Sequence, residues 1–366
     1  MKRILIIAAD GLTKSGVPNV FMSIIKELHS KGYSFDVAYF DNENAYYKGI
    51  IESYGGKAIY CSIDEKKTSK FKKILVKANY KKLLRMVIEE NGPYDCVHSF
   101  KGFESGYFLK AAKKLNIPVR IAHMTFLHKK SSSFFVNAIE KHEKHLTKKY
   151  ASIIISDSNN TSENNLPDSK KRVVIRNIVD ENIFPFNELD KNTQPISLVQ
   201  IGSYCQNKNQ LLSLDILRGL LERFPNSNLH LVGFRNPDDF SYFDTLNSRI
   251  ANEELGGHVV LHEFDADLRE IFKRSHYLLF PSHFESFGIV PVEAQMSGLF
   301  CFCSDTISKE NNCGGCKYIS ISDSKLWVNE IIQHFDAFQG KHKRFDCSEF
   351  SKNNIIKKYE GIYNGK

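Results

Sequence analysis

The sequence contains no apolar run as long as a membrane-spanning helix or a secretory signal peptide requires. The run nearest the start, Ile4 to Ala9, has six residues and ends at Asp10. A signal peptide needs about 7–15 apolar residues and a spanning helix about 20. We therefore expect a cytoplasmic protein, in which the eight cysteines would be reduced thiols.

Compositional bias is absent as well. Charged residues make up 25% of the 366 positions, beside 21 glycines and 10 prolines, and no short repeat or low-complexity tract occurs. These figures argue against a disordered, collagen-like or coiled-coil chain. At one domain per ~150 residues, the length predicts two globular domains, each large enough to bury its own core.

Basic charge is unevenly distributed along the chain. Residues 1–190 carry 31 Lys and Arg against 21 Asp and Glu, whereas residues 191–366 carry 19 against 21. The excess lies mainly in residues 66–149, which hold 20 basic and 6 acidic side chains. An anionic partner that meets only the first domain would suit this asymmetry. No basic motif interleaved with aromatic residues accompanies it, so we expect no nucleic-acid partner.

The densest part of the basic region, residues 66–91, has the pattern of an amphipathic helix. Nine Lys and Arg surround one apolar side, which consists of Phe71, Ile74, Leu75, Ala78, Leu83, Val87 and Ile88. One interpretation is a helix that rests on an anionic membrane surface. The other, which we favour, is a core-packing helix with a solvated lysine face.

Short apolar runs and helical stretches alternate along both halves of the sequence. The opening run Arg3–Ala9, a glycine-containing turn and a helical pattern over Asn19–His29 are typical of the start of a parallel α/β sheet. The remaining runs predict further strands, at Phe35–Phe40, Lys57–Cys61, Asp95–Ser99, Val119–His123, Ser152–Ser156, Val173–Asn177, Ile196–Ile201, Asn228–Val232, Val259–His262, Tyr277–Pro281 and Phe300–Cys303.

The sequence thus predicts two doubly wound α/β domains in tandem, with the ligand between them at the carboxyl ends of the strands. Residues 1–182 would form the first domain, 183–195 a linker without periodicity, and 196–347 the second domain. The stretch Leu326–Tyr363 is helical by pattern, and its last part, 348–366, is expected to return to the first domain.

The segment 278–298, LLFPSHFESFGIVPVEAQMSG, combines a strand, a turn and a helix start with two carboxylates. Glu285 follows the strand end at Pro281, and the helix that begins near Pro291 carries Glu293 in its first turn. Exposed amides of such a turn suit phosphate or sugar oxygens, and the carboxylates can accept hydrogen bonds from hydroxyls at two places on one ligand. A glutamate in a first turn is also an ordinary partner of the helix dipole, which makes the pattern alone moderately specific.

This segment resembles the E-x7-E signature of the retaining glycosyltransferases of family 4, which have the GT-B fold, and Glu285 and Glu293 fill its two positions. Ser197–Asn209, SLVQIGSYCQNKN, resembles the family's strand and Gly-Arg-x-x-x-x-Lys-Asn loop, and Val174–Phe184 resembles its N-G-V-D-x-x-x-F segment. The opening SGVPNVFMSIIKEL is similar to the family's first loop and helix. The resemblance covers most of the chain and is closest to the branch that builds bacterial capsular polysaccharides and exopolysaccharides.

The resemblance implies roles for eight residues. Glu293 would hold the ribose hydroxyls of a nucleotide, and Glu285 would contact the donor sugar. Lys208 would neutralise the diphosphate, because a point charge suits phosphate oxygens. His123, which follows a predicted strand, matches the active-site histidine. Loop residues that approach the sugar and phosphates would be Gly16, Phe287, Gly288 and Ile289.

Two positions depart from the family's pattern. Ser203 stands where the family has an arginine for the diphosphate, so Lys208 would act alone or with Arg235 or another basic residue. Ser15 with Gly16 replaces the paired glycines of the first loop. The implied reaction is a metal-independent transfer with retained anomeric configuration, in which Lys208 and the amides stabilise the departing diphosphate. Glu285 is then a positioning residue and not half of a hydrolase pair of carboxylates.

The cysteines and the remaining histidines give weaker indications of a functional site. The pairs C-x-C and C-x2-C at 301–303 and 313–316 have a spacing that zinc could use, but we expect no metal because Cys301 and Cys303 should not both face one ion. His98 and the histidines at 128, 142, 145 and 262 have no partner that the sequence identifies, and we expect surface or structural roles for them.

Three alternatives stay open beside the glycosyltransferase. A nucleotide-sugar epimerase would share the architecture, whereas a phosphorylase needs a pyridoxal phosphate lysine that the sequence does not place. A two-lobed binding protein that catalyses no reaction is usually exported with a signal peptide, and we identify no such pattern in the sequence. We predict a glycosyltransferase that moves a sugar from a UDP-sugar to a glycan or lipid-linked saccharide, without a cofactor, in the cytoplasm and peripherally at the inner face of the membrane.

Overall fold

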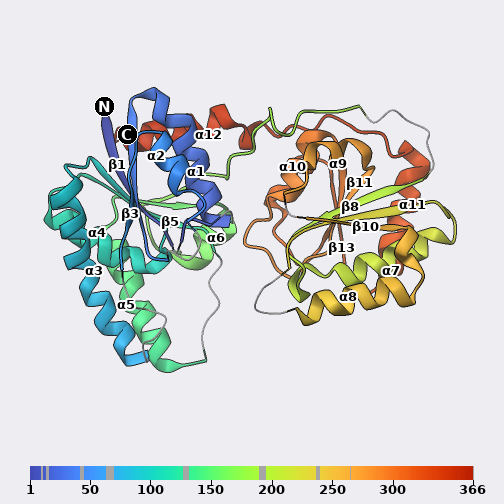
Figure 1. Cartoon of the computed structure of the whole chain (residues 1–366), viewed down its shortest axis with the longest axis horizontal. Coiled ribbons are helices and arrows are strands. Elements are labelled where there is room, and N and C mark those ends of the chain that lie inside the picture. Colours follow the sequence, from blue (N-terminus) through green and yellow to red (C-terminus); the bar gives the residue numbers. More distant parts are fainter. Residues whose placement is uncertain are drawn as a thin grey trace. The chain divides into compact units, whose positions relative to one another are not determined.

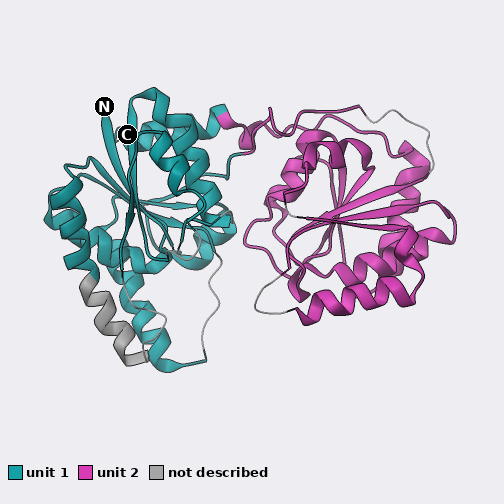
Figure 2. Ribbon diagram, viewed as in Figure 1, with its two compact units in different colours: residues 1–178, 353–366 teal, residues 179–352 magenta. Residues whose placement is uncertain are grey.

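The computed structural model divides the chain into two compact units (Figure 2), residues 1–178 with 353–366 and residues 179–352. It describes the chain except for residues 10, 14–15, 42–44, 63–69, 127–131, 189–194, 236–239, 264 and 366, and except for the side chains of residues 70–79. Ser15, one position of the first-loop motif, therefore lies outside the described residues.

Unit 1 is built on a seven-stranded sheet in the order β3-β2-β1-β4-β5-β6-β7, and all its strand pairs are parallel. The strands are β1 Lys2–Ile7, β2 Tyr33–Tyr39, β3 Ala58–Tyr60, β4 Cys96–Ser99, β5 Val119–Met124, β6 Ile153–Ser156 and β7 Arg172–Val174. Alternate residues of the interior strand β1 enter different cores, Ile4 and Ile6 on one face and Leu5 and Ile7 on the other. This two-sided burial explains the continuous apolar run in the sequence.

Helices cover both faces of this sheet (Figure 1). Residues of α1 and α12 pack into the core on one face, and residues of α3 and α4 pack into the core on the other. The helices of unit 1 are α1 Gly16–Leu28, α2 Lys48–Ser53, α3 Lys70–Asn91, α4 Ser105–Lys114, α5 Phe134–Tyr150, α6 Asn159–Asn165 and α12 Lys352–Tyr363.

Unit 2 repeats the architecture with a six-stranded sheet in the order β10-β9-β8-β11-β12-β13. Its elements are β8 Ser197–Ile201, α7 Gln210–Leu221, β9 Asn228–Val232, α8 Ser241–Asn252, β10 Val259–His262, α9 Leu268–Arg274, β11 Tyr277–Phe280, α10 Val290–Ser297, β12 Phe300–Ser304, β13 Cys316–Ile319 and α11 Ser324–Phe338. All its strand pairs are parallel. Helices α7, α8 and α11 share one core, and α9 and α10 share the other.

The predicted fold class is confirmed, because both units are parallel sheets with helices on both faces. The strand order reverses between β1 and β4 in unit 1 and between β8 and β11 in unit 2. In such sheets a ligand binds outside the carboxyl ends of the strands at this switch point. In unit 2 this point lies between the loops that carry Lys208 and Glu285.

The stretch Leu326–Tyr363, which the pattern predicted to be helical, is helical only in part. Helix α11 ends at Phe338, where Gln339 and Gly340 take left-handed φ values of 51° and 63°, a conformation that terminates helices. Helix α12 begins at Lys352 and buries five apolar residues in the unit 1 core, namely Ile355, Ile356, Tyr359, Ile362 and Tyr363. Within the described part of the chain, every helix is too short or too polar to cross a membrane.

Candidate functional site

Two loops at the switch point of unit 2 are hydrogen-bonded to each other. The first follows β8 and contains Asn207, and the second follows β11. The backbone N–H of His283 donates to the Asn207 carbonyl oxygen at 2.8 Å, and the Asn207 side-chain amide donates to the Phe284 carbonyl oxygen at 2.9 Å. Asn209, in the left-handed conformation with a φ of 57°, donates to the Pro281 carbonyl oxygen at 3.3 Å. The two loops therefore form one platform.

Lys208 and Glu285 form an ion pair across this platform, between Nζ and Oε1. The side chains are 22% and 15% exposed, so the pair is largely but not fully removed from water. Gly202 makes room for it, because a Cβ at this position would lie 3.1–3.2 Å from the Lys208 side chain. Gln200 holds the Lys208 carbonyl oxygen through its side-chain amide at 2.7 Å.

The turn before α10 is shaped by a glycine and a buried asparagine. Gly288 has a left-handed φ of 78°, which favours glycine. The Asn311 side-chain amide donates to the carbonyl oxygens of Phe287 and Gly288, each at 3.2 Å. Helix α10 then begins after Ile289 without a side-chain cap. An uncapped helix start of this kind attracts anions and hydroxyl oxygens.

Gln295 anchors α10 from inside the core. Its side chain is fully buried and donates to the carbonyl oxygens of Pro291 at 2.9 Å and Asn311 at 2.8 Å. Its oxygen accepts from the backbone N–H groups of Cys313 at 2.8 Å and Gly315 at 2.9 Å. This network fixes the helix that carries Glu293.

Glu293 itself is partly exposed, and it makes no ion pair or hydrogen bond to another described side chain. Desolvation raises the pKa of its carboxyl to about 7. Near neutral pH the group therefore titrates between a hydrogen-bond donor and an ionised acceptor.

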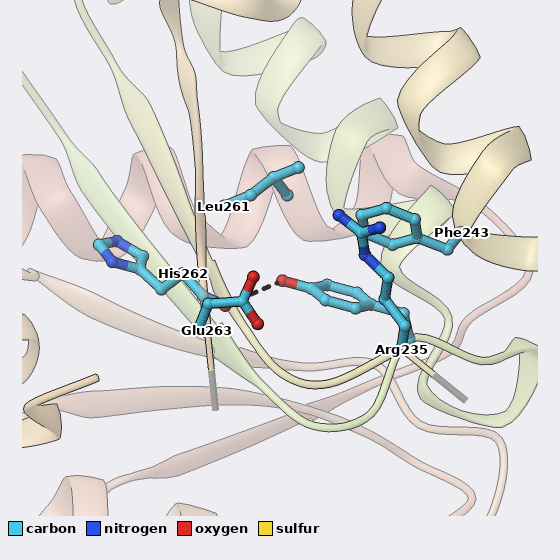
Figure 3. Close-up of a pocket in the computed structure, with 6 residues that line it drawn as sticks. Arg235, Phe243, Leu261, His262 and Glu263 are labelled. Atoms are coloured by element: carbon cyan, nitrogen blue, oxygen red, sulfur yellow. Dashed lines mark hydrogen bonds between the residues drawn. The ribbon is translucent and has the colours of Figure 1, made fainter. Parts of the chain in front are cut away.

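Ser203 and Arg235 contact different groups. The Ser203 hydroxyl lies 3.6 Å from the Cys205 sulfur. The Arg235 guanidinium carbon lies 4.3 Å from the centroid of the Phe243 ring. Arg235 lines a pocket of about 50 Å³ together with Tyr204, Phe243, Leu261, His262 and Glu263. Figure 3 shows these residues around it. The structure does not bring Arg235 and Lys208 into this pocket together.

Two of the eight predicted site residues belong to unit 1. His123 lies in β5 and is fully buried, with Nδ1 3.2 Å from Nε2 of His98. Burial lowers the pKa of His123 to about 3. Its Nε2 has no hydrogen-bond partner among the described residues. Gly16 is the first residue of α1, and open space surrounds the position that a Cβ would take.

Sequence reasoning missed two members of this buried group. His98 was expected to be a surface or structural histidine, and it joins His123 to the Tyr363 hydroxyl, which lies 2.9 Å from His98 Nδ1. The one signal available was that His98 and His123 sit near the ends of two successive predicted strands. Tyr363 could not be found, because it depends on the packing of α12 against unit 1.

The four cysteines at 301, 303, 313 and 316 share one hydrophobic core. The expectation that Cys301 and Cys303 would face different sides was wrong, because residues two apart on a strand share a face. Burial raises the pKa of both thiols, which keeps them protonated. Among the described residues no group of His, Cys, Asp or Glu side chains has a geometry that could hold a metal ion.

Known proteins resemble both the second unit and the whole chain. Residues 182–310 match the family described as Glycosyl transferases group 1. EpsF from Bacillus subtilis (strain 168), which its name places among the glycosyltransferases, is 23% identical over 94% of this chain and 90% of its own. The capsular polysaccharide biosynthesis glycosyltransferase CapH from Staphylococcus aureus is 27% identical over 78% of this chain and 80% of its own.

The fold also has solved counterparts. The crystal structure of Anabaena HepE in complex with UDP superimposes with a TM-score of 0.78, at 16% identity and over 100% of both chains. At this identity the likeness establishes the fold, which is GT-B, with two Rossmann-like units. The chain therefore has the GT-B fold, and residues 182–310 in its second unit match the glycosyl transferases group 1 family.

Proposed function

We propose that the protein is a retaining glycosyltransferase of family 4 that moves a sugar from a UDP-sugar to a glycan or lipid-linked saccharide in capsule or exopolysaccharide synthesis. The observation that carries the proposal is the Lys208–Glu285 ion pair beside the uncapped helix that bears Glu293, inside the segment that matches the glycosyltransferase family. The name of CapH supports a role in polysaccharide synthesis. The UDP complex of HepE supports a uridine nucleotide as the carrier of the donor sugar.

In this proposal the ion pair is opened by the donor. Glu293 accepts hydrogen bonds from the ribose hydroxyls, and Lys208 moves its charge toward the diphosphate as that group departs. A cation aimed at developing negative charge in a partly dehydrated site is an effective form of catalysis. Glu285, released from Lys208, contacts the hydroxyls of the sugar. The reaction needs no metal ion, because Lys208 and the amides before α10 take the charge of the leaving group.

The test of the proposal is a transfer assay without added metal. Purified protein is incubated with UDP-, GDP- or ADP-glucose and a panel of lipid-linked saccharides, and the released nucleotide and the anomeric configuration of the product are measured. We expect release of UDP and an α-linked product from an α-linked donor. A β-linked product would disprove retention, and a protein that releases no nucleotide with any donor and acceptor would disprove the proposed activity.

The pKa of Glu293 predicts how donor binding depends on pH. Because that pKa is raised to about 7, the carboxylate that accepts from a ribose diol is fully formed only above pH 7 and is lost as the pH falls below it. The affinity for UDP-glucose should rise about tenfold between pH 6 and pH 8, in proportion to the ionised fraction. Isothermal titration calorimetry at several pH values measures this slope.

A matched variant isolates this effect. UDP-glucose has no group that titrates between pH 6 and 8, so the slope belongs to the protein. In Glu293→Gln the affinity should be low and independent of pH. An unchanged slope in this variant would assign the titration to another group.

We also propose that unit 1 meets the inner surface of an anionic membrane, where a lipid-linked acceptor would lie. Lys81 and Lys82 of α3 are exposed, and at the start of α5 the side chains of Phe134 and Phe135 are 80% and 77% exposed. Exposed basic residues and exposed aromatic residues are both typical of surfaces that bind such membranes.

Vesicle sedimentation tests this contact. Binding to vesicles with anionic lipid should exceed binding to neutral vesicles, and should fall more than about tenfold when Lys72, Lys73, Lys81 and Lys82 are replaced by Glu, because each lysine near the surface contributes ~1 kcal/mol. The same charge change in unit 2, at Lys273, Lys325, Lys341 and Lys343, is the control. Equally weak binding to both kinds of vesicle would contradict the proposal.

A further inference from the structure

We infer that Tyr363 and His98 fix the tautomer of His123, so that His123 offers an N–H donor at Nε2 to a bound ligand. One hydrogen-bonded chain joins the three residues, from the Tyr363 hydroxyl to His98 Nδ1 at 2.9 Å and from His98 Nε2 to His123 Nδ1 at 3.2 Å. The inference rests on the proposed function for the identity of the ligand alone.

The two imidazole rings are arranged for a direct hydrogen bond. Their planes differ by 3° and their centroids are 5.3 Å apart, a separation that fits two rings lying edge to edge in one plane, where the nitrogen lone pair points. The ring of Phe100 lies 4.5 Å from each imidazole centroid and covers both. His98, His123 and Tyr363 are all fully buried, so the hydrogen bonds between them lie away from water.

Counting protons shows which residue donates in each of these two hydrogen bonds. Burial lowers the pKa of both histidines and raises that of Tyr363, so each group carries one proton. The Tyr363 hydroxyl has no other acceptor among the described residues, and its proton therefore points to His98 Nδ1. His98 must then carry its proton on Nε2 and donate to His123 Nδ1. This leaves the proton of His123 on Nε2.

The Nε2–H of His123 is the group that can donate to a ligand. It is buried and has no partner among the described residues, which is rare for a polar atom in a folded protein. A sugar hydroxyl or a diphosphate oxygen would satisfy it. In this tautomer His123 cannot accept a proton at Nε2, so it stabilises ligand oxygens as a donor and does not act as a base. His98 and Tyr363 are positioning residues.

The tautomer can be measured directly by NMR. Protein labelled with ¹⁵N-histidine gives long-range ¹H–¹⁵N correlations that distinguish protonated from unprotonated ring nitrogens, and a His123→Gln variant assigns the signals. We expect His123 to carry its proton on Nε2 and to have an unprotonated Nδ1. Tyr363→Phe removes the hydroxyl alone, and the two nitrogen shifts of His123 should then converge as the tautomers mix.

Two further variants separate this effect from a loss of folding. His98→Gln places an amide N–H where Nε2 lies and should keep His123 in the Nε2–H form, whereas His98→Leu should not. Tyr359→Phe is the control, because Tyr359 is buried on the same helix and its ring lies 6.2 Å from that of His98. It should leave the His123 shifts unchanged.

The inference is overturned if His123 carries its proton on Nδ1 in the wild-type protein, or if Tyr363→Phe and His98→Leu both fold and leave its shifts unchanged. The experiment needs no substrate. A protein that transfers no sugar but has the expected tautomer would disprove the proposed function and leave this inference standing.

Discussion

Replacing Lys208 with Ala should lower the turnover of the nucleotide-sugar donor by about 100- to 1,000-fold, the usual cost of losing one group that stabilises the charge of a transition state. Lys208 is the cation that the described structure places between the two loops of the switch point, and Ser203 supplies no second charge beside it. The variant also leaves Glu285, whose side chain is 15% exposed, without its ion-pair partner. Steady-state kinetics with a saturating donor measure the loss.

Lys317→Ala is the matched control, since Lys317 pairs with Glu330 at 3.1 Å on the same unit and is half exposed. Its turnover should stay within about twofold of the wild type, because exposed ion pairs contribute little. The double variant Lys208→Ala with Glu285→Gln should lose less than the product of the two single losses, because the two groups interact directly. A Lys208→Ala enzyme as active as the control would remove Lys208 from the mechanism.

Replacing Gln295 with Leu should destabilise unit 2 by about 2–4 kcal/mol. Leucine has a similar volume but leaves the N–H groups of Cys313 and Gly315 buried without acceptors, and each unsatisfied group costs ~1–3 kcal/mol. The single tryptophan of the sequence, Trp327, is buried in the core of unit 2. Its fluorescence during denaturant unfolding therefore reports on this unit.

The same substitution should weaken nucleotide binding in protein that is still folded, since Gln295 holds the helix that carries Glu293. Gln333→Leu on the exposed face of α11 is the control and should change neither quantity. If Gln295→Leu unfolded at the same denaturant concentration as the wild type, the four hydrogen bonds of Gln295 would contribute little net stability.

The fold was largely predictable because most strands are short, continuous apolar runs buried on both faces. The predicted bounds of β9 and β10 are those of the structure. Strand β13 escaped notice because it is an edge strand of four residues with an exposed lysine, CKYI. The break between α11 and α12 depends on the backbone conformation of Gln339 and Gly340, and a non-glycine residue in the left-handed region gives no reliable signal in a sequence.

The site was predictable where its residues lie close together along the chain. Glu285 and Glu293 lie on one loop and the helix that follows it, so their pattern is visible in one segment. Lys208 and Glu285 lie on loops 77 residues apart. The resemblance named each residue separately, and nothing in the sequence indicated their ion pair. The chain from His123 through His98 to Tyr363 spans 265 residues between its last two members, and no local pattern indicates it.

The role of Glu293 in holding a nucleotide is the central claim, and calorimetric titration with UDP, GDP and ADP in the absence of metal tests it most directly. The wild-type protein should bind one of these nucleotides, UDP by this account, and Glu293→Ala should abolish that binding while Trp327 fluorescence shows unit 2 still folded. Equal nucleotide affinity in the two proteins, or no binding of any nucleotide to the wild type, would contradict the account.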